Sequence, residues 1–233
     1  MSYDSPKAFR PIVFLNTLGK LIEKVIGERL QFHVVSNNFI HQSQLGGLKF
    51  KSTSDAGVAL THFIHMGWVK NLSTSSLAFD ISQFFPSLNH CLLSLTLGKA
   101  GFNFHIVQFF SNYLGETRYF WNNINVGVRQ GLALSPILSA LYLSPFLHIL
   151  ENQLKNLKIP ISFLLFVDDG LLVTQSKSFQ LSNSRLFCSY NVASILLLDF
   201  RLVVEHSKTK IFHFSRSIGL FNPPSCQDHR KWT

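Results

Sequence analysis

Two adjacent carboxylates interrupt an apolar segment near the middle of the C-terminal half of the chain. Asp168 and Asp169 follow the apolar run FLLFV (residues 163–167) and precede GLLV (residues 170–173). Burying even one unpaired carboxylate costs roughly several kcal/mol unless it is paired or bound to a metal. Because two neighbouring carboxylates also repel each other, the pair requires either a cation or a tight turn that is open to water.

A third carboxylate, Asp80, closes another short apolar run, residues 77–79. Three carboxylates at neighbouring strand ends can hold two Mg²⁺ ions, since Mg²⁺ prefers oxygen ligands and keeps substrate phosphates and waters in its shell. Two such ions can activate an attacking hydroxyl group and stabilise a leaving pyrophosphate oxygen. The alternative for Asp168 and Asp169 is an ordinary hairpin turn, because Asp169–Gly170 is a strong turn signal. The residues alone leave both interpretations open.

The elements that must position these carboxylates can be predicted from apolar periodicity. Helical spacing and capping signals predict helices over residues 18–32, 53–69, 87–99, 132–150 and 177–198. Short apolar runs predict strands over residues 10–15, 77–79, 161–167, 170–173, 202–205 and 211–214. In the first helix, the spacing predicts an apolar face of Leu18, Leu21, Ile22, Val25, Ile26 and Leu30, with Lys20, Glu23, Lys24 and Arg29 opposite. The mixture indicates an α+β fold on an antiparallel sheet, with the Asp pair at a hairpin tip.

The composition of the chain limits the classes of partner that it can bind. Its 233 residues are 46% hydrophobic, and the formal net charge of +9 favours an acidic partner, with nucleic acid first and a merely basic protein as the alternative. The three cysteines are far apart, which argues for reduced thiols in an intracellular protein. Residues 132–150 carry no Asp, Glu, Lys or Arg, but two prolines and several polar residues favour a core helix over a membrane span.

Several segments resemble the motifs of reverse transcriptases, in the same order and at similar spacing. Motif A is resembled by LAFDISQFFPSLNH (77–90), and motif B by GVRQG (127–131) together with LSPIL (134–138). Motif C is resembled by FVDD (166–169), and motif D by EHSKTK (205–210). Upstream, RPI (10–12) and LGKLIEK (18–24) are similar to the fingers region of non-LTR, LINE-like retrotransposon polymerases. The resemblance covers residues 9–216 and implies a right-hand polymerase palm with partial fingers. Five weak motifs in order are strong evidence together.

The resemblance implies an RNA-directed DNA polymerase with two Mg²⁺ ions, or Mn²⁺ as the alternative ion. Asp80 and Asp168 would be the main metal ligands, Asp169 the third carboxylate, and the backbone carbonyl of Ile81 would complete a metal shell. The implied partners are an RNA template, a DNA primer and deoxynucleoside triphosphates, without a membrane. Membership of this family would imply a nuclear location, where such polymerases usually act. The sequence does not indicate an oligomeric state.

The same resemblance implies residues that hold the incoming nucleotide. Phe85 falls at the sugar-gate position, where a bulky ring would clash with a ribose 2′-hydroxyl; the alternative is a core Phe. Gln130 would contact the nucleotide, and Gly131 would let the backbone approach it. Arg10 and Lys20 would hold the triphosphate, because cations suit phosphate oxygens, and Lys208 would donate a proton to the pyrophosphate. For these three cations, and for Lys49 and Lys51 as template contacts, an ordinary solvated charge remains the alternative.

The chain also departs from the family pattern. Arg129 stands where motif B usually has Pro, and Leu132 where it has a small hydroxyl residue. Residues 101–130 offer little room for the usual fingers return, and only 25 residues follow Lys208. We therefore expect partial fingers (1–76), a palm with a shortened fingers return (77–216), a loose tail (217–233) and a largely absent thumb. A truncated or decayed copy that only binds nucleic acid is the alternative to an active enzyme.

Overall fold

A mixture of helices and short strands forms the part of the chain that the computed structural model describes, residues 14–115, 118–119, 122–123, 126–128 and 131–216. The helices are α1 (Thr17–Ser36), α2 (Thr53–Val69), α3 (Phe84–Ser87), α4 (His90–Lys99), α5 (Phe104–Gly115), α6 (Ser135–Asn156), α7 (Phe179–Asp199) and the 3₁₀ turn η2 (His206–Lys208). The strands are β1 (Ser73–Ser82), β2 (Arg118–Tyr119), β3 (Asn122–Asn123), β4 (Ser162–Phe166), β5 (Asp169–Ser176), β6 (Val203–Val204) and β7 (Lys210–Phe214).

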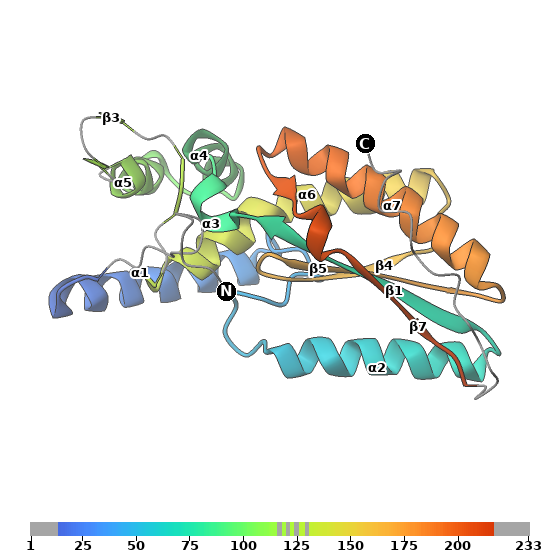
Figure 1. The fold of residues 1–233 in the computed structure, drawn as a ribbon. Coiled ribbons are helices and arrows are strands. Elements are labelled where there is room, and N and C mark those ends of the chain that lie inside the picture. The colour runs from blue at the N-terminus through green and yellow to red at the C-terminus, as the bar shows by residue number, and fades with distance from the viewer. Residues whose placement is uncertain (1–13, 116–117, 120–121, 124–125, 129–130, 217–233) are drawn as a thin grey trace, which may run out of the picture.

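The main sheet is built around β1, and all of its pairings are antiparallel (Figure 1). One edge of β1 pairs with β5 over its length, and β5 in turn pairs with β4. The other edge of β1 is shared by β7, near the start of the strand, and by β6, near its end. The predicted α+β class and the predicted hairpin are confirmed.

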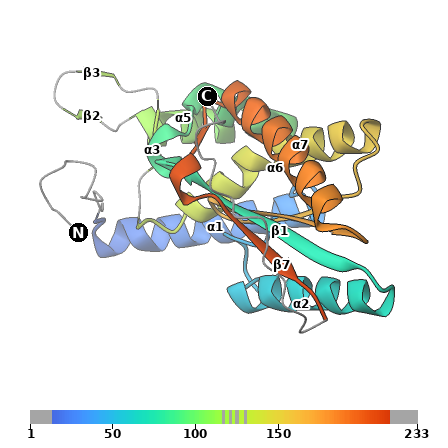
Figure 2. The ribbon, with the colours of Figure 1, turned by 45° about the vertical axis from the view of Figure 1, so that its right-hand side comes forward.

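Helices lie on both faces of this sheet. Figures 1 and 2 show α6 and α7 on one face and α2 on the other. Alternate residues of β1, namely Leu77, Phe79 and Ile81, are buried in the same core as α6 and α7. On the opposite face the side chain of Gln175 donates a 2.6 Å hydrogen bond to the carbonyl of Phe63 in α2. Because strand side chains alternate, Asp80 lies on this second face, away from α6 and α7.

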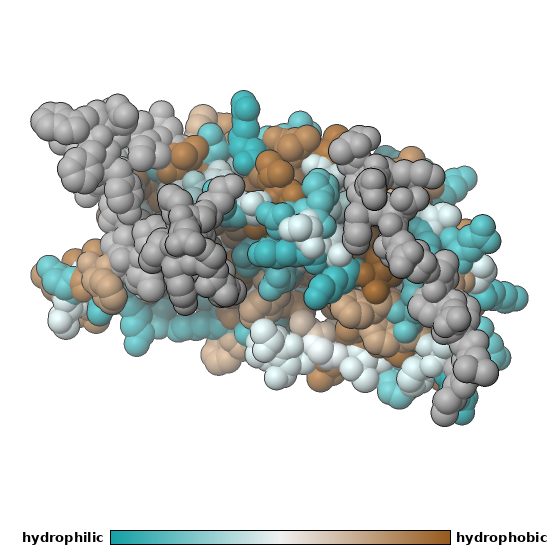
Figure 3. Space-filling model, viewed as in Figure 1, coloured by the Kyte–Doolittle hydropathy of each residue, from teal (hydrophilic) through white to brown (hydrophobic). Residues whose placement is uncertain are grey.

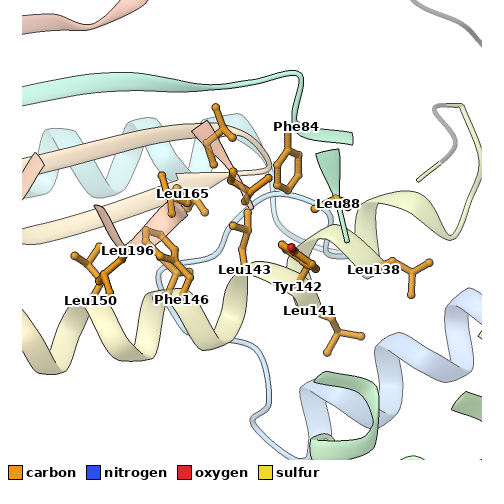
Figure 4. Close-up of a cluster of buried hydrophobic side chains, with 14 of the residues drawn as sticks. Phe84, Leu88, Leu138, Leu141, Tyr142, Leu143, Phe146, Leu150, Leu165 and Leu196 are labelled. Carbon is orange, nitrogen blue, oxygen red and sulfur yellow. The ribbon is translucent and has the colours of Figure 1, made fainter. Parts of the chain in front are cut away.

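The apolar core gathers on α6, which is buried around most of its circumference. Figure 4 shows Phe84, Leu165 and Leu196 meeting the α6 side chains from α3, β4 and α7. The prediction of a core helix is confirmed, although α6 begins at Ser135 and runs to Asn156. Within the described residues, no helix is long and apolar enough to cross a membrane.

The predicted buried face of α1 is confirmed for Leu30 and for Ile26, which packs against the core, and is wrong for the other four residues. Its buried residues are Glu23, Leu30 and Val34, whereas the exposed residues include Leu18 (64%), Leu21 (58%), Ile22 (49%) and Val25 (45%). Glu23 tolerates burial because its carboxylate accepts hydrogen bonds from the hydroxyl of Tyr113 and, at 3.1 Å, from the backbone N–H of Ala133. The helix is therefore rotated so that a carboxylate faces the core.

Other element boundaries were partly predictable. The predicted N-cap of α2 is confirmed, because Ser52 and Asp55 form a capping box. The helix α5 was not predicted. Phe14 and Leu15 are not in a strand, and the rest of the predicted strand 10–15 lies outside the described residues, as does the predicted tail, residues 217–233.

Candidate active site

Strand register brings the predicted carboxylates to one end of the sheet. Asp80 is the residue directly opposite Asp169 in the β1–β5 pairing. Directly opposite residues have Cβ atoms about 4.5–5.5 Å apart and point to the same face. Asp168 lies in the hairpin turn, and its carbonyl accepts a 3.2 Å hydrogen bond from the N–H of Ile81. The side chain of Ile81 is buried, so only its backbone can face the site.

The hairpin turn is centred on Val167 and Asp168, between the end of β4 and the start of β5. Asp169 and Gly170 are already paired with β1, so the turn lies at Val167 and Asp168 and not at Asp169 and Gly170. Val167 has φ +61°, a conformation that is a genuine outlier for a β-branched residue. Such strain persists only when the surroundings enforce it, and it concentrates at functional sites.

Two glycines permit the close packing that holds this turn. A Cβ atom on Gly46 would lie 2.3 Å from the backbone nitrogen of Val167. The segment around Gly46 runs along the outer edge of β4, where Leu45 N donates to Leu165 O at 2.8 Å and Leu165 N donates to Ser43 O at 2.9 Å. On the other side, Gly170 faces the ring of Phe79, which a Cβ atom would meet at 2.2 Å.

Electrostatics at the site reflect this crowding of negative charge. Partial burial raises the pKa of Asp169, repulsion by Asp80 raises it further, and Lys208 opposes both. The ammonium of Lys208 contacts the Oδ2 atom of Asp80, whose side chain is 17% exposed. Motif D is therefore brought next to motif A. On the face seen in Figure 3, hydrophilic side chains gather near the centre, where Figure 1 places η2.

Phe85 lies in α3, directly after the β1 strand that carries Asp80. Its side chain is half-buried against the core, while its neighbour Phe84 is 2% exposed. The carbonyl of Phe85 accepts a 2.8 Å hydrogen bond from the N–H of Val128. Motif A and the start of motif B are thus bonded to each other.

A hollow of about 420 Å³ lies between α1 and the loop that precedes α6. Its lining includes Lys20, Lys24 and Glu23 from α1 and Gly131, which has φ +91°. Two predicted nucleotide-binding residues, Lys20 and Gly131, are therefore brought together. Arg10 and Gln130, the other two predicted for this part of the site, lie outside the described residues. Glu23 was missed because a carboxylate next to Lys24 indicates an exposed position.

The two predicted template contacts, Lys49 and Lys51, lie on the segment between α1 and α2. Lys49 forms a 2.7 Å ion pair with Glu28 of α1, and Lys51 is exposed. Surface pairs of this kind contribute little to stability, and the side chain of Lys49 is 53% exposed. Both lysines therefore remain accessible cations.

A second group of ligand-type side chains lies away from the carboxylates. The potential ligand atoms of His41, His148 and Glu151 lie within 4.8 Å of one another. The Nδ1 atom of His41 accepts a 3.1 Å hydrogen bond from the N–H of Ser43, so the ring proton lies on Nε2 and is donated to Glu151 Oε2 at 3.1 Å. A metal ligand would need the Nε2 lone pair and would normally donate its other ring proton. We interpret the group as a set of hydrogen bonds that holds the segment around His41 and Ser43 beside β4.

One solved structure with a similar fold is apo telomerase from Candida tropicalis truncated from the C-terminal domain. The TM-score is 0.61 and the sequence identity 14%, and the match covers 85% of this chain and 41% of that chain. Another is telomerase from Candida albicans in complex with a TWJ fragment of telomeric RNA, with TM-score 0.59, 14% identity, and 85% and 35% covered. At this identity the likeness shows the fold alone, which is that of a polymerase palm.

Among curated proteins, the chain is similar to the transposon TX1 uncharacterized 149 kDa protein of Xenopus laevis. The two are 26% identical over 183 residues, which cover 72% of this chain and 14% of that protein. The chain thus spans about a seventh of the length of this relative. A family model described as reverse transcriptase (RNA-dependent DNA polymerase) matches residues 3–231. Because this match covers nearly the whole chain, the protein belongs to the reverse transcriptase family.

Proposed function

We propose that this chain synthesises DNA on an RNA template by nucleotidyl transfer to a primer 3′-hydroxyl. The observation that carries the proposal is the register that places Asp80 opposite Asp169, with Asp168 in the adjoining turn. Membership of the reverse transcriptase family supports the reaction class, and that family generally uses divalent metal ions.

The residues at the end of the sheet fit divalent ions. Asp80, Asp168 and Asp169 supply oxygen donors alone, with the carbonyl of Ile81 beside them, and this donor set suits Mg²⁺ or Mn²⁺. The raised pKa of Asp169 reflects burial and repulsion by Asp80, both of which a bound cation would offset. When bound, two ions would activate the attacking hydroxyl and stabilise the leaving oxygen.

In the proposed step the primer 3′ oxygen forms a bond to the α-phosphorus of a deoxynucleoside triphosphate. The bond from that phosphorus to the bridging oxygen breaks, pyrophosphate leaves, and the hydroxyl proton passes to water. Lys208 would give a proton to the pyrophosphate, a role supported by the contact of its ammonium with Asp80 and by the 63% exposure of its side chain.

The nucleotide would be held from two sides. We assign the triphosphate to Lys20 and Arg10, and close backbone approach to Gly131, with Gln130 beside it. The shared hollow that Lys20 and Gly131 line supports this assignment. Phe85, which follows the motif A strand, would exclude a ribose 2′-hydroxyl by its bulk.

The template would be RNA held through its phosphates. Lys49 and Lys51 would supply sequence-independent contacts that weaken as salt increases. The net charge of +9 supports such contacts, as does a similar fold in a telomerase solved with an RNA fragment. We assign residues 1–76 to partial fingers and residues 77–216 to the palm.

Primer extension on an RNA template with Mg²⁺ tests the proposal, with Asp168→Asn as the variant. This change keeps the side-chain shape and removes one charge, so we expect a loss of at least about a hundredfold in extension rate. Asp199→Asn is the matched control, because it removes an exposed carboxylate at the end of α7. Equal extension by wild type and Asp168→Asn contradicts the mechanism. No extension by wild type, together with salt-sensitive RNA binding, favours a remnant that only binds nucleic acid.

A further inference from the structure

Tyr190 of α7 lies behind the carboxylates, on the buried face of the sheet. Its side chain is 2% exposed, and its ring packs edge-on against Phe79, with ring centroids 6.0 Å apart. Its hydroxyl lies 2.6 Å from Nδ1 of His206 and 3.2 Å from Oγ1 of Thr209. A buried Tyr thus reaches both ends of the turn that follows β6.

That turn carries Lys208. His206 begins the 3₁₀ turn η2, Lys208 ends it, and Thr209 follows. Its backbone is tied to the motif A strand, because the N–H of Glu205 donates a 2.8 Å hydrogen bond to the carbonyl of Asp80. The side chains of His206 and Lys208 are exposed. We therefore expect the position of the turn to depend on the contacts that Tyr190 makes with His206 and Thr209 at its two ends.

We propose that Tyr190 is a positioning residue that holds Lys208 at Asp80 through His206 and Thr209. The inference rests on the proposed function, because it concerns the same carboxylates. An ammonium at Asp80 neutralises charge where a divalent cation would bind, so Lys208 and the cation compete for this carboxylate. Tyr190 therefore affects metal affinity without touching the metal, and it keeps Lys208 where the leaving pyrophosphate would form.

Tyr142 provides a matched control for Tyr190→Phe. Tyr142 is 1% exposed, and its hydroxyl donates a 2.5 Å hydrogen bond to the carbonyl of Phe200, at the end of α7. Tyr190→Phe and Tyr142→Phe each remove one hydroxyl group from a similarly buried ring. A loss of stability alone would therefore affect both variants in the same way.

The first measurement is Mn²⁺ binding to the folded chain without substrates, followed by electron paramagnetic resonance. We expect Tyr190→Phe to tighten binding about twofold to fivefold, Lys208→Ala to tighten it at least as much, and Tyr142→Phe to leave it unchanged. In the Lys208→Ala background, Tyr190→Phe should add nothing, since both changes act through one contact. Thr209→Val, a half-buried position, is the second variant should Tyr190→Phe fail to fold.

The second measurement is single-turnover extension, in which Tyr190→Phe should lower the maximal rate about tenfold while the KM for the nucleotide stays the same. The inference is overturned if Mn²⁺ affinity is unchanged in Tyr190→Phe and Thr209→Val, if tightening persists without Lys208, or if no variant binds Mn²⁺. A shift in Mn²⁺ affinity without extension by any variant supports the positioning role and refutes the proposed function instead.

Discussion

The Gly170→Ala substitution would place a methyl group within the ring of Phe79, next to two of the carboxylates. The added Cβ atom would lie 2.2, 2.5 and 2.6 Å from three ring atoms, distances that require the ring or the strand to move. The ring has little freedom, because Phe79 is 4% exposed and packs against Tyr190. Overpacking of this kind costs about 1–3 kcal/mol.

Backbone effects alone would act in the opposite direction. Alanine inside a strand is favoured over glycine by roughly 0.5–1 kcal/mol, so a net loss of stability reports the clash. Each kcal/mol lowers the midpoint of thermal unfolding by about 2–4 °C for a chain of this size. Because Gly170 follows Asp169 and Phe79 precedes Asp80, we expect the extension rate to fall as well.

Urea unfolding followed by circular dichroism measures the loss, with Gly57→Ala as the control. Gly57 lies in α2, and a Cβ atom there would meet nothing within 4 Å, so we expect a gain of about 0.4–1 kcal/mol. Phe79→Leu should recover part of the loss in a double variant, with a coupling energy of about 1 kcal/mol. A Gly170→Ala chain at least as stable as wild type would refute the packing of the hairpin against β1.

Three further expectations concern other parts of the structure. Glu23→Ala should lower the free energy of unfolding by about 1–3 kcal/mol in urea titrations, because two hydrogen bonds to a charged acceptor, from the Tyr113 hydroxyl and the Ala133 N–H, are lost. A smaller loss than Glu28→Ala gives would contradict this role. The free energy of unfolding should fall as the pH is lowered from about 7 to 5, because burial lowers the pKa of His41 in the folded chain and the unfolded chain therefore binds more protons. His41→Gln should flatten this part of the pH profile of stability. A profile that is unchanged in His41→Gln would exclude His41 as the cause. Phe85→Val should raise ribonucleotide incorporation at least about tenfold relative to deoxynucleotide in competition assays, and unchanged selectivity would assign Phe85 to the core alone.

The carboxylates could be located from the sequence because each follows a short apolar run in a family motif. Their register could not be predicted, since β1 extends beyond residues 77–79 into Ser73, Ser75 and Ser76. Ser75 is 0% and Ser76 is 1% exposed, and Ser73 is half-buried, yet a run of serines is typical of a loop. Polar strand residues of this kind depend on neighbouring elements that local sequence does not specify.

The orientation of α1 could not be predicted because it depends on residues far along the chain. Tyr113, 90 positions after Glu23, supplies one of the hydrogen bonds that permit the carboxylate to be buried. The positive φ of Val167 is likewise enforced by tertiary contacts, among them the close approach of Gly46. The role of Tyr190 was not visible either, since a Tyr in a helix gives no indication of which loop its hydroxyl meets.

The central claim is that Asp80, Asp168 and Asp169 hold two divalent ions side by side. Electron paramagnetic resonance of the chain with Mn²⁺, primer–template and a non-reactive deoxynucleoside triphosphate analogue tests it most directly, because ions about 3.5–4 Å apart are magnetically coupled. We expect two Mn²⁺ ions per chain with a coupled spectrum that is lost in Asp168→Asn and kept in Asp199→Asn. A spectrum of isolated ions, or a coupled spectrum that survives Asp168→Asn, would contradict the account.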